Sequence, residues 1–252
     1  LGVYYREFTE KAPWTTVKID DSGLAYRFAY GEDASLVGLS FDGSIGPVAV
    51  GAELGYHFDA ALKTPSFSIT DEGARGDTWH ALVNAVYLLP NSKIWDTGTV
   101  VAELTYDRID SVNDNEDLFL RDGTTACEQS SRPVRGVGDA SWGCATRDAW
   151  GFGVVFSPKW LQVVPGLDLC TPLRLTMGLD GNSAVIAGVN EDAGAWSVGV
   201  ELEYKRLHFL TLSYADNFAD RHTTDGVAWG GNGSGFPTTD RGRINLTYKV
   251  SF

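Results

Sequence analysis

The sequence lacks long apolar runs, and it has a single methionine and only three cysteines in 252 residues. No stretch approaches the roughly 20 consecutive apolar residues of a membrane-spanning helix, which excludes a helical membrane protein. Strands that cross a membrane are not excluded, because they alternate apolar and polar residues. Basic residues are also scarce, and the net charge of -13 argues against nucleic acid as a partner.

The C-terminal segment alternates without an error. Ile244, Leu246, Tyr248, Val250 and Phe252 fall on one face, and polar residues fill the positions between them. A period of two predicts a strand with one apolar and one polar side. A strand that ends on an aromatic residue is typical of bacterial outer-membrane barrels, whose outer face meets lipid and whose inner face meets water.

The same alternation recurs along the whole chain. Apolar residues occupy every second position in the ranges Val48–Phe58, Trp79–Leu89, Val100–Tyr106, Trp150–Phe156, Leu167–Leu169, Leu173–Leu179, Trp196–Tyr204 and Leu210–Tyr214. We expect region 8–35 to form an external loop, with Leu24–Tyr30 extending a strand at Val37–Phe41. The count comes to about ten strands, an even number as single-chain barrels prefer.

The pattern therefore predicts an all-β fold in one domain, residues 1–252. We expect a transmembrane antiparallel up-and-down β-barrel, standing alone or forming part of a larger barrel. The alternative is a soluble antiparallel barrel or sandwich, which also alternates. Long strands with aromatic ends, uneven connections and the terminal Phe252 favour the membrane barrel.

The connections between these segments alternate in length. Short turns are expected near Gly43–Pro47, Pro90–Gly98, Val164–Gly166 and Lys205–Arg206, and long loops at about 59–77, 108–148, 180–194 and 216–241. Outer-membrane barrels have short periplasmic turns and long external loops. We therefore expect the long loops outside the cell and Phe252 at the periplasmic side. The expected partners are outer-membrane lipid and lipopolysaccharide, the barrel-assembly machinery through the C-terminal strand, and other envelope proteins.

Charged residues fall on the predicted inner face. The candidates for a lumen lining are Glu53, His57, His80, Glu103, Asp107, Arg174, Asp180, Glu201, Glu203, Lys205, Arg243 and Lys249. A basic residue facing lipid near the midplane would cost about 2–4 kcal/mol, whereas a residue facing the lumen is hydrated or paired. In a narrow barrel these charges would form a structural salt-bridge network. In a wider barrel they would line a pore.

Cys127 and Cys144 lie in the longest loop. A disulfide between them would stabilise the fold by roughly 3 kcal/mol in the chain-entropy model. The alternative is two unpaired thiols. The remaining Cys170 points inward by parity and is interpreted as a small interior residue.

Chemistry-bearing motifs are weak. The acidic residues of the 108–148 loop could hold Ca²⁺, but their spacing misses the EF-hand pattern, so a solvated acidic loop is the preferred interpretation. The four histidines show no metal-ligand spacing, and no Gly-x-Ser-x-Gly elbow is present. We expect no metal, no cofactor and no enzymatic activity.

An ordered set of segments resembles one family. The segments are Leu1–Tyr5, Tyr30–Asp33, Gly38–Phe41, Thr146–Phe152, Pro165–Leu169, Asp180–Ser183 and Tyr248–Phe252. They resemble a large uncharacterised family of proteobacterial outer-membrane proteins, known as a domain of unknown function. The resemblance implies that this chain is the C-terminal part of a larger barrel or a truncated protein, and that genes of the family accompany systems that handle hydrophobic compounds. It supplies no catalytic residues.

Together these observations predict an outer-membrane channel or transporter for small hydrophobic or amphipathic molecules. The competing hypotheses are a structural or interaction barrel within a larger envelope assembly and, third, an outer-membrane enzyme.

Overall fold

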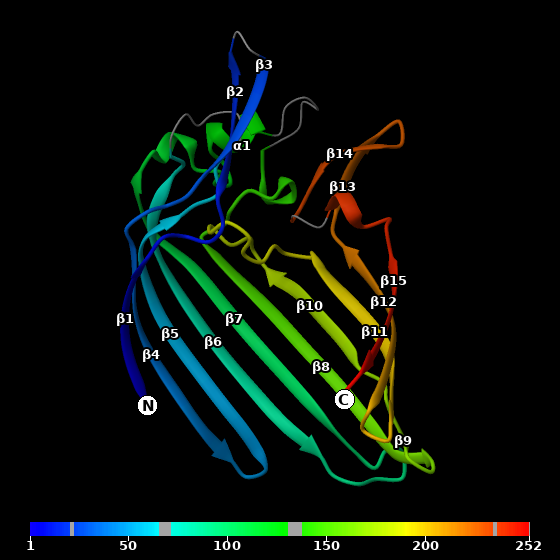
Figure 1. Cartoon of the computed structure of the whole chain (residues 1–252). Helices are drawn as coiled ribbons and strands as arrows, with labels where there is room; N and C mark the ends of the chain where they lie inside the picture. Colours follow the sequence, from blue (N-terminus) through cyan, green and yellow to red (C-terminus); the bar gives the residue numbers. More distant parts are fainter. Residues whose placement is uncertain (21–22, 66–71, 131–137, 234–235, 252) are drawn as a thin grey trace.

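The fold is built from one large antiparallel sheet, shown in Figure 1. The computed structural model describes residues 1–20, 23–65, 72–130, 138–233 and 236–251. Along the sheet, the strands follow one another in the order β1 (Gly2–Phe8), β4 (Ala34–Ile45), β5 (Val48–Ala61), β6 (Arg75–Leu89), β7 (Thr97–Asp114), β8 (Asp148–Val164), β10 (Leu173–Asp180), β11 (Gly194–Tyr204), β12 (His208–Phe218) and β15 (Arg243–Val250). An eleventh strand, β9 (Leu167–Cys170), pairs with both β8 and β11. The predicted all-β, up-and-down arrangement is confirmed.

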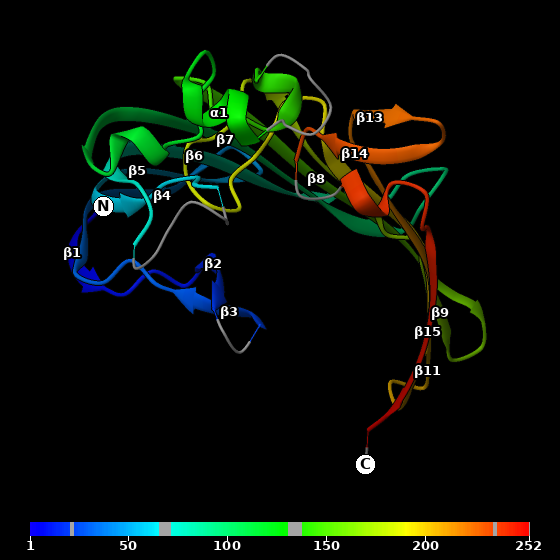
Figure 2. The same cartoon turned by 90° about the horizontal axis from the view of Figure 1, so that it is seen from above.

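The sheet curves into an open arc, which Figure 2 shows from above. The strands β1 and β15 stand at the two ends of the strand order, and in the described part of the chain they do not pair with each other. Closure into a barrel is therefore not part of the observed structure, although the curvature and the meander order are those of a barrel wall.

Short turns and long loops gather at opposite ends of the sheet (Figure 1). The turns after β4, β6, β8 and β11 lie at one end, and the Lys205–Arg206 turn has φ of 52° and 58° at its two residues. Leu207 N–H donates to Tyr204 O at 3.1 Å, so Lys205 and Arg206 are the central residues of a β-turn, and positive φ at both is typical of a turn that matches the strand twist. The predicted alternation of short and long connections is confirmed, and the side of the membrane on which each end lies stays a prediction.

The long loops carry the smaller elements. These are two hairpins, β2 (Trp14–Asp20) with β3 (Gly23–Ala29) and β13 (Arg221–Thr224) with β14 (Val227–Gly231), the helix α1 (Thr125–Ser130), and the 3-10 turns Glu116–Leu118, Ala140–Trp142 and Phe236–Thr238. The prediction that Leu24–Tyr30 extends the next wall strand was wrong. Its residues form β3, whose partner is β2, because a local hairpin satisfies their backbone before the chain re-enters the sheet at Ala34.

The hydrophobic core lies among the loops and not between the strands. Its largest cluster consists of Leu62, Ala74, Ile109, Phe119, Ala145 and Ala184, all at the long-loop end. On the sheet itself large apolar side chains stay exposed, with Val83 at 55% and Leu212 at 49%. The sheet thus has an apolar face with no protein packed on it in the described structure, while the loops form a separately packed cap.

Candidate functional site

One face of the sheet carries most of the predicted lumen-facing residues. Residues directly opposite each other in an antiparallel pair have side chains on the same face. The register sets Glu53 opposite Leu82 and Arg174 opposite Ser197. Followed from strand to strand, it places these predicted residues on one polar face: Glu53, His57, His80, Glu103, Asp107, Arg174, Glu201, Glu203, Arg243 and Lys249. That this face lines a lumen stays a prediction.

The polar face is the concave one. Glu10 and Ile186 line a cavity together with His57 and His80 of the polar face. In Figure 2 the segments that carry Glu10 and Ile186 lie inside the arc of the sheet. The curvature therefore turns the charged row inward and the apolar row outward, as in a membrane barrel.

The register does not place two of the predicted residues in this row. An irregularity between Gly178 and Asp180 sets Asp180 opposite Trp150, which belongs to the apolar row, so parity counted along the strand fails there. Lys205 lies in the turn after β11, and its Nζ sits 5.1 Å from the centre of the Tyr204 ring. The assignment of Asp180 to the inner face was wrong because a bulge interrupts the period of two. Lys205 lies past the last paired residue of β11, so its assignment stays a prediction.

An ion cluster marks the short-turn end of the polar face. Lys159 Nζ lies 3.3 Å from Asp168 Oδ2 and 3.2 Å from Glu203 Oε2. All three side chains are about one quarter to one third exposed, so solvent screens the pairs and each contributes little stability. Sequence parity predicted Glu203 on this face but did not identify Lys159 as its partner.

A hydrogen-bonded chain crosses β6 and β7 near the long-loop end. His80 Nδ1 lies 2.7 Å from Asp107 Oδ1, and His80 Nε2 lies 2.8 Å from the Thr78 hydroxyl oxygen. The carboxylate can only accept, so Nδ1 carries a hydrogen, and in the neutral ring Nε2 then accepts from Thr78. The two partners fix the orientation and the tautomer of His80.

Thr78, His80 and Asp107 are linked in the same order as the nucleophile, the general base and the orienting carboxylate of a catalytic triad. Thr78, however, is 1% exposed, so a substrate carbonyl cannot reach its hydroxyl. The described geometry therefore favours a structural role, in which these hydrogen bonds hold His80 in place, over nucleophilic attack by Thr78 on a substrate.

Next to this chain lies a cavity of about 230 Å³. Glu10, His57 and His80 form its polar part. The remaining lining is apolar and comprises Ala12, Ala61, Val185 and Ile186. His57 was predicted as an isolated inner-face residue, and the structure brings it together with His80, whose ring centre is 5.8 Å away, and with a carboxylate from outside the sheet.

Glu10 reaches the cavity from the segment between β1 and β2. Its backbone N–H donates to Gly31 O at 2.8 Å, and its Oε1 accepts from the Ala61 N–H at 3.3 Å. Burial raises the pKa of the Glu10 carboxyl above its ordinary value. Trp14 fixes the same segment by donating from Nε1 to Leu62 O at 2.8 Å.

Polar side chains also join the long loops to one another. Lys63 Nζ donates to Asn190 Oδ1 at 3.0 Å, and Asn190 Nδ2 donates to Asn232 Oδ1 at 2.7 Å. Burial lowers the pKa of Lys63 to about 8. These bonds connect three loops that are distant in the sequence and make the cap one hydrogen-bonded unit.

The predicted disulfide is present in this cap. Cys127 and Cys144 are bonded, with a Cα–Cα distance of 6.0 Å. Asn182 Nδ2 donates to Cys144 O at 2.8 Å and so ties the bridge to the 180–194 loop. Cys170 carries a free thiol, half-buried on the polar face.

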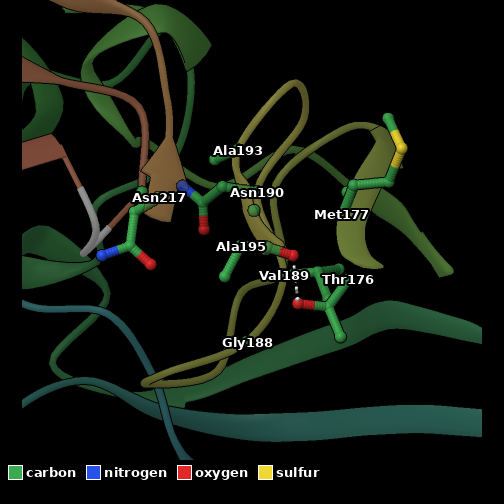
Figure 3. A pocket seen from close by; sticks show the side chains of 11 residues that line it. Thr176, Met177, Gly188, Val189, Asn190, Ala193, Ala195 and Asn217 are labelled. Carbon is green, nitrogen blue, oxygen red and sulfur yellow. Dashed lines mark hydrogen bonds between the residues drawn. The ribbon is translucent and has the colours of Figure 1, made fainter. Parts of the chain in front are cut away.

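A second pocket of about 250 Å³ lies where the 180–194 loop meets β10 and β11 (Figure 3). Asn190 and Asn217 contribute its amide groups, and Thr176 Oγ1 donates to Ala195 O at 3.4 Å. The Asn217 Nδ2 donates to Thr238 Oγ1 at 2.8 Å, and Asn190 is used by the loop network. The amides of this pocket are thus already paired, which distinguishes it from the Glu10 cavity.

Glu10, Thr78, Trp14 and Lys63 were missed by sequence reasoning, because the contacts that give them roles join segments far apart in the chain. Among the described residues, no group of three or more His, Cys, Asp or Glu could hold a metal ion. Within the same residues, none of the helices has the length and apolarity to span a membrane. Phe252 lies outside the described residues. Its neighbour Ser251 donates to Leu207 O at 2.9 Å, which places the end of β15 at the short-turn end.

Comparison with known proteins gives three findings. A solved structure titled "Outer-membrane expressed OmpT of Vibrio cholerae" is similar over 98% of this chain, with 12% sequence identity and a TM-score of 0.39. This chain spans 64% of that protein's chain. No curated protein matches the sequence. A family model described as "Protein of unknown function (DUF1302)" matches residues 1–252. Since that match extends over the whole sequence, the chain belongs to the DUF1302 family.

Proposed function

We propose that this chain forms wall strands of an outer-membrane β-barrel that lets small hydrophobic or amphipathic molecules cross the membrane without covalent catalysis. One observation carries the proposal. The convex face of the sheet exposes a continuous apolar row, with Val83 at 55%, Leu104 at 40% and Val200 at 40% exposed. An exposed apolar surface of this extent must be covered by other apolar groups. In strands whose opposite face is polar, as in a membrane barrel, lipid covers the apolar face.

The orientation follows from the two ends of the sheet. We place the cross-linked loops outside the cell and the short turns, with the end of β15, in the periplasm, as in bacterial barrels. The C-terminal strand would then be available to the barrel-assembly machinery. The polar concave face would line the path, and its carboxylates would favour cations over anions.

Reconstitution tests the proposal. The folded protein is inserted into planar bilayers for current measurements and into liposomes for uptake of small amphipathic solutes. We expect current or solute flux, and a shift of the reversal potential toward anions when Glu53 or Glu103 is replaced by Lys. Val200→Ile, on the apolar face, is the matched control and should leave selectivity unchanged. Inserted protein that supports neither current nor flux would refute passage.

A structural or interaction role is the second candidate. The observation that favours it is the cap, in which the Cys127–Cys144 disulfide and the Lys63–Asn190–Asn232 bonds hold several loops in one arrangement. A fixed loop surface suits recognition by another envelope protein better than a mobile one does. Inserted protein that is impermeable but retains partners in cross-linking from intact envelopes would support this role.

A further inference from the structure

The cavity beside His57 contains polar groups that the described protein leaves without adequate partners. His57 Nε2 is buried and makes no hydrogen bond within the described part of the chain. Its nearest acidic atom, Glu10 Oε1, is 3.4 Å away, and the two side chains are 13% and 17% exposed. Buried polar atoms are nearly always hydrogen-bonded, so an open acceptor or donor that faces a cavity points to a ligand.

Among the residues that the structure describes, Glu10 lacks a strong cationic partner. Its Oε1 accepts one backbone bond from Ala61, and its ion pair among the described residues is with His57, which is charged only when protonated. Arg75 is the cation whose field reaches Glu10, but its guanidinium donates to the Asp59 carbonyl and pairs with Glu72 at 3.7 Å. Within the described ranges, a largely buried carboxylate thus faces the cavity, and its only ion pair is with His57.

The apolar lining and the volume of the cavity indicate the size and polarity of the rest of the ligand. Val185 and Ile186 come from the 180–194 loop and form the apolar part of the lining together with Ala12 and Ala61. The volume of about 230 Å³ exceeds the roughly 150 Å³ of a cavity that holds benzene. It is smaller than the pockets of about 300–1,000 Å³ that take drug-sized ligands. The occupant is therefore the size of one substituted ring or a short alkyl chain.

We propose that this cavity binds a small primary amine with an aromatic or short alkyl body, its ammonium group against Glu10 and His57 and its body against Val185 and Ile186. An ammonium group supplies three donors and the missing positive charge. A purely apolar molecule would leave His57 Nε2 without a hydrogen bond and Glu10 without a permanent cation beside it. An anion would be repelled by Glu10 and by Asp107, which is bonded to His80. The net charge of -13 draws cations toward the protein. The inference rests on the proposed function and narrows its substrate class to cationic amphipathic molecules.

Binding is measured with 4-fluorobenzylamine by ¹⁹F NMR on the purified full chain in detergent, with 4-fluorobenzyl alcohol as the neutral comparison. We expect saturable binding of the amine, weaker binding of the alcohol, and a loss of amine affinity of about ten- to a hundredfold in Glu10→Gln, since a bond to a charged group is removed. Asp42→Asn is the matched control, because Asp42 is an exposed carboxylate of β4 on the same face of the sheet, outside the cavity and without a role in the proposed path. It should bind the amine like the unchanged protein.

Ile186→Trp provides a second variant that fills the cavity and keeps Glu10, in case Glu10→Gln fails to fold. It should abolish binding of both probes. Equal amine affinity in the unchanged protein and either cavity variant would overturn the inference, as would an alcohol that binds as tightly as the amine. Liposome flux separates the two proposals. Amine binding without flux would support the binding site and refute the channel, and flux without amine binding would refute the binding site only.

Discussion

Arginine substitutions at two neighbouring positions of β6 test whether the convex face meets lipid. Val83 lies near the middle of Arg75–Leu89, opposite Ala52 and Leu104 of the apolar row, and is 55% exposed. Asn84 is the next residue and points to the polar face, opposite Glu103. The two positions share a strand and a depth, and they differ in the face that receives the charge.

The expected magnitudes differ strongly. An arginine at the lipid-facing midplane of a barrel costs about 2–4 kcal/mol, whereas a substitution at an exposed position of a soluble protein usually changes stability by less than about 0.5 kcal/mol. Val83→Arg should therefore lower the folding equilibrium constant in bilayers by roughly thirty- to a thousandfold. Asn84→Arg should be close to neutral, because its guanidinium can approach Glu103 across the strand pair.

The assay is a urea titration of folding into phospholipid vesicles, followed by tryptophan fluorescence and by the electrophoretic shift of the folded form. A Val83→Arg variant that is as stable as Asn84→Arg would refute the lipid-facing assignment. That result would favour the soluble antiparallel sheet, in which Val83 would simply face water.

Three further predictions concern the cap. Trp14→Ala removes a side chain that is 3% exposed and its bond to a loop carbonyl, so the β2–β3 amides should lose protection worth about 3–5 kcal/mol in hydrogen exchange; unchanged protection would contradict the anchoring role. Replacing both Cys127 and Cys144 by Ser opens a loop of 17 residues' separation and should destabilise the cap by about 3 kcal/mol; a urea midpoint equal to that of the oxidised protein would argue against this. Lys63, with its pKa lowered to about 8, should titrate near that pH in ¹³C-dimethyl-lysine NMR spectra, and the resonance should be absent in Lys63→Arg. In the unfolded chain the Lys63 amine has a pKa near 10.5, so between about pH 8 and 10.5 the unfolded state binds more protons than the folded state. The stability contributed by Lys63 therefore rises with pH in this range. An NMR titration midpoint near 10.5 in the folded protein would show that the amine is not buried.

The wall of the sheet was predictable because alternation is a local property. Side chains of successive strand residues point to opposite faces, so parity alone placed Glu53 and Arg174 on one face before any pairing was known. Parity fails where one residue is inserted or where the strand ends. Asp180 follows a bulge, which leaves no clear mark in the pattern of apolar residues, whereas the turn at Lys205 was predicted from the sequence.

The cavity was not predictable for the opposite reason. Glu10 obtains its role from His57 and Ala61, and Ile186 faces the same space from a third segment. Each residue alone is ordinary: an acidic residue in a loop, a histidine on a strand, an isoleucine near a turn. Their juxtaposition depends on how the β2–β3 segment docks on the end of β5, which sequence periodicity does not describe.

The separation of the cap from the wall has a consequence for stability. The buried apolar residues of the large sheet, such as Ala61, Leu89 and Ile109, lie toward the ends of its strands, and the apolar face between them is exposed. This face must therefore be covered by lipid or detergent to be stable. The cap buries Leu62, Phe119 and Trp14 among protein atoms and is closed by a disulfide. Its packing therefore does not depend on the membrane. Exchange of a long-chain for a short-chain detergent should accordingly lower the stability of β6 and β7 more than that of residues 115–130, and an equal loss in both would indicate that the convex face is covered by protein.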